Sequence, residues 1–109
     1  MENNKMIMEI PTKFNVGGQE INVRIKDTIP NDLLGSCTLW NGDISIANIY
    51  KGIEQSPSSK LNTFYHELTH AILDSMGEFE LSQNERFVTS FSGFLTQAIS
   101  TFEYNDKTE

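Results

Sequence analysis

Residues 56–77 read SPSSKLNTFYHELTHAILDSMG, a run with the beginning, the periodicity and the end of one amphipathic helix. Ser56 offers an N-cap hydroxyl, and Pro57 fits the first helical position. Gly77 is suited to end the helix in a left-handed conformation. The apolar side chains between these signals fall on one side of a helical wheel: Leu61, Phe64, Tyr65, Leu68, Ala71, Ile72 and Met76. The opposite side is polar and consists of Ser59, Thr63, His66, Glu67, His70 and Asp74.

The polar side contains an H-E-x-x-H motif, His66-Glu67-Leu68-Thr69-His70. Residues four apart on a helix project from the same face, so the imidazoles of His66 and His70 can bind a single Zn²⁺. Glu67 lies beside them and can take a proton from a metal-bound water without being a ligand itself. The motif therefore predicts a zinc-dependent hydrolase with Glu67 as the catalytic base. The alternative is a solvated helix face that reads H-E-x-x-H by chance.

A third ligand is needed, because a catalytic zinc site usually has three protein ligands and the chain has only two histidines. The acidic candidates are Asp74, Glu78, Glu80 and Glu85. Asp74 is on the same helix as the histidines, where it is suited to orienting one of them or the helix end. Glu85 would lie over the motif if the next helix returned antiparallel, so we expect it to be the third ligand. The competing interpretation is a capping box over residues 82–85, in which Glu85 bonds the Ser82 N–H.

The residues before the motif predict β-strands joined by glycine turns. Residues 14–16 and 20–25 flank Gly17-Gly18, and residues 37–40 and 43–47 flank Asn41-Gly42, which is typical of two β-hairpins. Residues 7–10 are a further candidate strand.

A second helix is expected after the motif, from about residue 82 to about residue 104. Small residues on one side of it, among them Ser92 and Gly93, would allow close packing on the first helix. We therefore predict an α+β fold, with a small N-terminal antiparallel or mixed sheet followed by two packed helices.

Composition narrows the functional classes. The chain has 109 residues, which is one domain, and its net charge of −7 with no basic cluster argues against nucleic acid as a partner. The single Cys37 excludes an internal disulfide and a multi-cysteine zinc site, and is best interpreted as a small buried thiol. Residues 1–10 lack the long apolar stretch of a signal peptide, and no run has membrane-spanning length. We expect a cytoplasmic protein with no membrane partner.

The run HELTHAILD over residues 66–74, followed by Asn84-Glu85, resembles the gluzincin metallopeptidases. The wider layout resembles the small ImmA/IrrE-type zinc peptidases of bacteria and phages, in which a G-x-I-x-I strand, here residues 42–46, precedes the motif. The resemblance covers about residues 38–100. It implies a single zincin-like metallopeptidase domain over residues 1–109, with a protein or peptide substrate. It also implies that His66, His70 and Glu85 are the zinc ligands and that Glu67 is the general base.

Two departures from these families leave alternatives open. Thr89 stands where thermolysin-like enzymes have an aspartate, and no downstream histidine exists to stabilise an oxyanion. The residues that could replace that histidine are Tyr50, Tyr65, Tyr104 and Arg86. An extended substrate could pair with the strand at residues 43–47 if that strand is a free sheet edge. The alternative function is a catalytically inactive or metal-free interaction module on a zincin-like scaffold.

Overall fold

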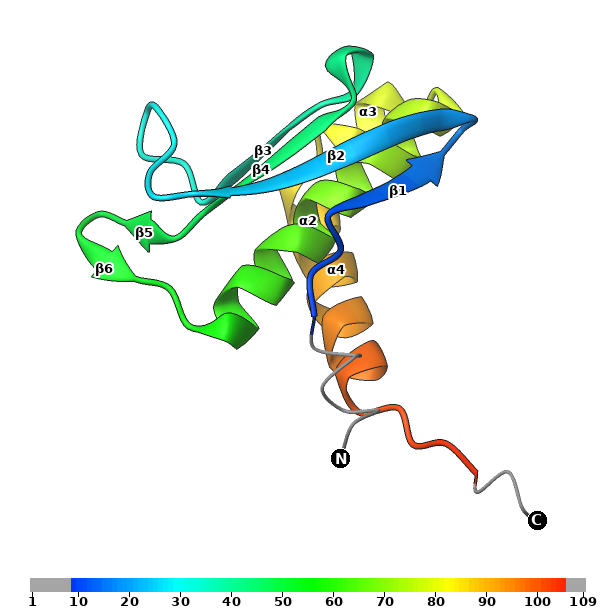
Figure 1. The fold of residues 1–109 in the computed structure, drawn as a ribbon. Coiled ribbons are helices and arrows are strands. Elements are labelled where there is room, and N and C mark those ends of the chain that lie inside the picture. The colour runs from blue at the N-terminus through cyan, green and yellow to red at the C-terminus, as the bar shows by residue number, and fades with distance from the viewer. Residues whose placement is uncertain (1–8, 106–109) are drawn as a thin grey trace.

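The protein has an α+β fold in which a mixed sheet precedes the helices, as Figure 1 shows. The computed structural model describes residues 9–105. The strands are β1 (Lys13–Val16), β2 (Gln19–Lys26), β3 (Gly35–Thr38), β4 (Asp43–Ala47), β5 (Ile49–Tyr50) and β6 (Ile53–Glu54). The helices are the 3₁₀ turn η1 (Leu39–Asn41), α2 (Pro57–Met76), α3 (Phe79–Ser82) and α4 (Glu85–Ser100). The predicted fold class is confirmed.

The first predicted hairpin is present as β1 and β2. The two strands are antiparallel, with Val16 opposite Gln19 across the turn. Gly17 and Gly18 both have positive φ, 60° and 77°, as the favoured two-residue hairpin turn requires. The candidate strand at residues 7–10 lies partly outside the described residues, and Glu9 and Ile10 belong to no strand.

Strand β4 lies inside the sheet, whose order is β1-β2-β4-β3. It pairs parallel with β2 and antiparallel with β3. Ile44 and Ile46 of β4 are fully buried, whereas β3 has small residues and no apolar run, so the more apolar strand takes the interior position. Residues 43–47 therefore do not meet the condition of a free edge, and the edge strand on this side is β3.

The predicted pairing of β3 with β4 is confirmed, but their connection is longer than a two-residue turn. It contains η1 and ends at Gly42, whose φ is 70°. A Cβ at Gly42 would lie 2.6 Å from the carbonyl oxygen of Glu20. Glycine therefore lets this turn pack directly against the β1–β2 hairpin.

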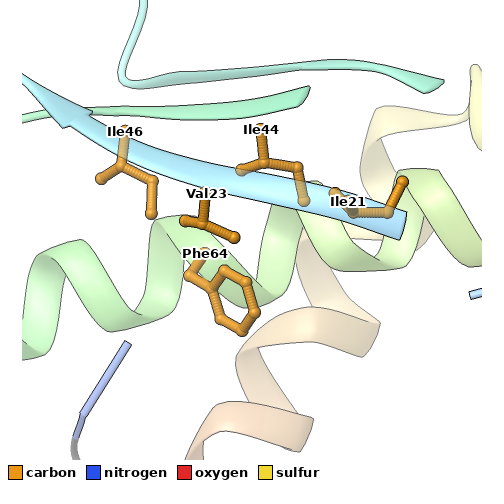
Figure 2. Close-up of a cluster of buried hydrophobic side chains, with 5 residues drawn as sticks. All are labelled: Ile21, Val23, Ile44, Ile46 and Phe64. Atoms are coloured by element: carbon orange, nitrogen blue, oxygen red, sulfur yellow. The ribbon is translucent and has the colours of Figure 1, made fainter. Parts of the chain in front are cut away.

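Helix α2 begins and ends at the predicted residues. The Ser56 hydroxyl accepts a hydrogen bond from the Ser59 N–H at 3.1 Å, and Gly77 closes the helix with a φ of 81°. One side of α2 packs against the sheet, where Phe64 meets buried side chains of β2 and β4 (Figure 2). This cluster consists of Ile21, Val23, Ile44, Ile46 and Phe64.

The predicted second helix is shorter than expected, so its predicted bounds of about 82 to about 104 are wrong. The short helix α3 ends at Ser82, and α4 begins at Glu85 and ends at Ser100. Asn84 is the N-cap of α4, because its side-chain oxygen accepts from the Phe87 N–H at 3.1 Å. The capping box over residues 82–85 is not formed, since the Ser82 N–H donates to the Glu78 carbonyl. This leaves the Glu85 carboxylate available for contacts outside its own helix.

Helix α4 contacts α2 and buries Val88 and Ser92, so a small residue does lie at the buried face as expected. Within residues 9–105, no helix combines the length and the apolar character needed to cross a membrane.

Candidate metal centre

Three predicted ligands converge at the junction of α2 and α4. His66 Nε2 lies 3.1 Å from Glu85 Oε1, and His70 Nε2 lies 3.2 Å from Glu85 Oε2. One ligand atom from each of these residues lies within 4.8 Å of the other two. The helical spacing of the histidines places both rings on one face of α2, and the break before α4 aims Glu85 at them.

The donor set fits a catalytic zinc site. A tetrahedral Zn²⁺ with bonds of roughly 2.0–2.1 Å separates its ligand atoms by about 3.3 Å. The His66–Glu85 and His70–Glu85 distances of 3.1 and 3.2 Å, which end on the two different carboxylate oxygens, are close to this value. Burial lowers the pKa of His66, as does the neighbouring His70, while Glu85 opposes both effects. A lowered pKa favours the neutral imidazole, which is the form that binds a metal.

Ser82 contacts the other ring nitrogen of His70. Its Oγ lies 3.0 Å from His70 Nδ1, and Ser82 is only 6% exposed. If Nδ1 carries the proton and donates to this hydroxyl, the lone pair on Nε2 faces Glu85 and is free to bind a metal. The sequence prediction missed this contact, because it assigned Ser82 to a helix cap. No local pattern marks it, since the contact depends on how α3 packs against α2.

Glu67 lies beside the centre as a buried carboxyl. It is 7% exposed, and burial, followed by the charge of Glu85, raises its pKa to about 7. Strand β3 comes very close at this point: a Cβ on Gly35 would lie 3.1 Å from Glu67 Oε2 and 2.6 Å from Thr63 Cγ2. Gly35 therefore allows the edge strand to reach the polar side of α2.

Two cavities meet at the candidate centre. The first, of about 640 Å³, lies between residues 33–37 and the polar side of α2. The second, of about 700 Å³, lies between residues 37–40 and α3. Both are lined by Cys37, His70, Asp74 and Glu85. Together they make one cleft that follows the free edge of β3 past the three donor atoms.

Asp74 and Cys37 lie in this cleft without taking part in the convergent trio. Burial, with a further contribution from the charges of Glu67 and Asp74, raises the pKa of the Cys37 thiol to about 12. The thiol therefore stays protonated near neutral pH. Asp74 lines both cavities, but the described partner of His70 Nδ1 is Ser82, and the supporting role of Asp74 stays a prediction.

The four residues considered as oxyanion donors line neither cavity. These are Tyr50, Tyr65, Tyr104 and Arg86. The polar side chains that do line the cleft near the centre include Asn62 and Thr89 in the first cavity and Gln83 in the second.

Comparisons of the chain with protein-family models, with curated proteins and with solved structures found no match.

Proposed function

We propose that the protein is a zinc-dependent metallopeptidase whose metal is held by His66, His70 and Glu85. The observation that carries the proposal is the convergence of these three side chains beside a buried carboxyl, in a cleft that β3 borders. When bound, Zn²⁺ would polarise the substrate carbonyl and lower the pKa of the attacking water.

Glu67 performs the proton transfers in this proposal. Its carboxylate takes a proton from the attacking water and then delivers it to the nitrogen of the leaving amine. A pKa raised to about 7 suits a group that must both accept and release a proton near neutral pH. Gly35 brings β3 against Glu67, which restricts the positions open to the carboxylate.

The substrate in this proposal is an extended polypeptide that pairs with β3. Only one side of β3 is paired within the described sheet, where β4 occupies it. The free side offers backbone N–H and C=O groups to a further strand. Because β3 lines both cavities, a peptide paired with it would pass the candidate centre. We expect the protein to act on a narrow range of protein substrates.

One observation favours the alternative of an interaction module without catalysis. The predicted oxyanion donors Tyr50, Tyr65, Tyr104 and Arg86 all lie outside the cleft. The same edge strand and cleft would bind a peptide in a protein that does not cleave it.

The first experiment measures zinc per chain by elemental analysis on protein purified without a histidine tag. Peptide cleavage is then followed by mass spectrometry, using a mixture of decapeptides with randomised central positions. The proposal predicts close to one zinc per chain for the wild type and for Glu67→Gln, with cleavage reduced by roughly 10²–10⁴-fold in the variant.

Glu54→Gln is the matched control, because Glu54 is an exposed acid on β6 outside both cavities. It should retain both zinc and cleavage. Zinc without cleavage would favour the interaction module, and a wild type that binds no zinc would end the metallopeptidase proposal.

A further inference from the structure

Two large aromatic side chains are exposed in the second cavity. Trp40 is 83% exposed and Phe79 is 61% exposed, and both line the cavity between the end of β3 and α3. Aromatic side chains of this size are mostly buried in a folded chain and supply much of the binding energy where they line an interface. Here they flank the space that leads to His70 and Glu85.

Trp40 is presented by a turn that the fold holds in place. Gln19 Nε2 donates to the carbonyl of Leu39 at 2.6 Å, and the Asn22 N–H donates to the carbonyl of Gly42 at 2.7 Å. These bonds join both ends of the turn to the β1–β2 hairpin. Phe79 is the first residue of α3, directly after the end of α2. Both rings are therefore attached to ordered elements, which lowers the entropy lost when a ligand binds.

Among residues 9–105, none of those that line the part of the cavity away from the candidate centre is charged. Outside the residues that it shares with the first cavity, its lining is apolar or neutral, with Leu39, Trp40 and Phe79 as the apolar members. The whole chain has a net charge of −7, so this uncharged lining is a local feature. An uncharged wall that contains two exposed aromatic rings favours an apolar group over a charged one.

We propose that this cavity is a specificity subsite that receives a large apolar or aromatic side chain of a bound peptide, on one side of the candidate centre. Trp40 and Phe79 are the residues that determine the preference. That the bound peptide is a substrate rests on the proposed function, but the binding preference itself does not require hydrolysis.

The test compares two blocked pentapeptides, acetyl-Ser-Ala-Phe-Ala-Ser-amide and the same peptide with alanine at the centre. Titrations use the Glu67→Gln protein, with and without added zinc, so that cleavage does not interfere. Trp40 is the only tryptophan in the chain, so intrinsic fluorescence reports on this cavity directly. We expect the phenylalanine peptide to bind about tenfold more tightly and to change the Trp40 emission. Equal affinities, or no binding of either peptide, would overturn the proposal.

Variants then identify the residues that cause the difference in affinity. Their affinities are measured by calorimetry, because Trp40→Ala has no tryptophan fluorescence to follow. Trp40→Ala and Phe79→Ala should each reduce the difference in affinity between the two peptides several-fold. Phe94→Ala is the matched control, because Phe94 is 73% exposed on α4 but lines neither cavity. A preference that survives Trp40→Ala and Phe79→Ala, or is lost equally in Phe94→Ala, would contradict the assignment.

The same proteins and peptides distinguish a failure of this inference from a failure of the proposed function. If the wild type cleaves the randomised peptides with no enrichment of large apolar residues beside the cut bond, the subsite is wrong and the peptidase stands. If the pentapeptides bind to the Glu67→Gln protein with the expected preference but the zinc-loaded wild type cleaves none of the randomised peptides, the subsite stands and the peptidase falls.

Discussion

The two sides of helix α2 differ in what they bury. On the sheet side, Phe64 packs among isoleucine and valine side chains, and this cluster contains no polar group. On the cleft side, Glu67 is almost as well buried as Phe64, but its carboxyl lies in surroundings that oppose its charge. The sheet side stabilises the fold by removing apolar surface from water, whereas burial of the Glu67 carboxyl opposes folding. One helix thus separates the part of the molecule that maintains the fold from the part suited to chemistry.

The largest expected effect that tests this contrast is a change in the free energy of unfolding of the metal-free protein when Glu67 is replaced by glutamine. The pKa of Glu67 is about 7 in the folded chain, against 4.5 for the ordinary group, so the folded protein holds its proton over that interval. The free energy of unfolding of the wild type should therefore fall as the pH rises from the pKa of Glu67 in the unfolded chain to about 7. The total decrease should be roughly 3 kcal/mol, with no further change at higher pH. Urea unfolding in EDTA should show Glu67→Gln to be more stable than wild type at about pH 8 and equal to it below about pH 4.

Glu54→Gln controls for the loss of one negative charge at an exposed position. If the two glutamine variants have the same effect at every pH, or if the gain for Glu67→Gln does not depend on pH, the cleft side does not oppose the Glu67 charge and the comparison fails.

A smaller effect is expected for zinc affinity in Ser82→Ala. Removing the hydroxyl beside His70 Nδ1 frees the ring to rotate and change tautomer, so zinc affinity should fall by about 10–100-fold. Competition with a chelator measures the affinity, and Ser82→Thr, which keeps a hydroxyl, should recover most of it.

Ser92→Ala is the matched control for this experiment, because Ser92 is a buried serine whose hydroxyl bonds within α4. A loss of affinity common to Ser82→Ala and Ser92→Ala would mean that packing of the helices, and not orientation of His70, controls the metal site.

The smallest effects compare two glycines. A Cβ at Gly35 would press on Thr63 and Glu67, so Gly35→Ala should destabilise the protein by about 1–3 kcal/mol. Gly93 lies inside α4 and a Cβ there would meet nothing within 4 Å, so Gly93→Ala should stabilise it by about 0.5–1 kcal/mol. Urea unfolding at one pH measures both. If Gly35→Ala left the free energy of unfolding unchanged, the fold would not require β3 to lie close to Glu67.

Local signals in the sequence were sufficient for the elements that depend on neighbouring residues. Ser56, Pro57 and Gly77 gave both ends of α2, and Gly17-Gly18 gave the first hairpin. The approach of Glu85 to His66 and His70 was also predictable, because helical periodicity and a short connection leave few places for an acidic ligand.

Features that depend on packing between distant segments were not predictable. The position of β4 inside the sheet follows from parallel pairing with β2, which no turn signal marks. The break between α3 and α4 and the Ser82–His70 contact depend on how the connection folds over α2. The cavity beside Trp40 likewise exists only once η1 and α3 are placed opposite one another.

The candidate ligands have a further consequence for chain connectivity. His66 and Glu85 are nineteen positions apart and belong to adjacent helices, so a metal bound between them would act as a short cross-link. Closing a loop of this length removes little conformational entropy compared with linking distant segments. A metal held by His66 and Glu85 would therefore join α4 to α2 at a low cost in conformational entropy.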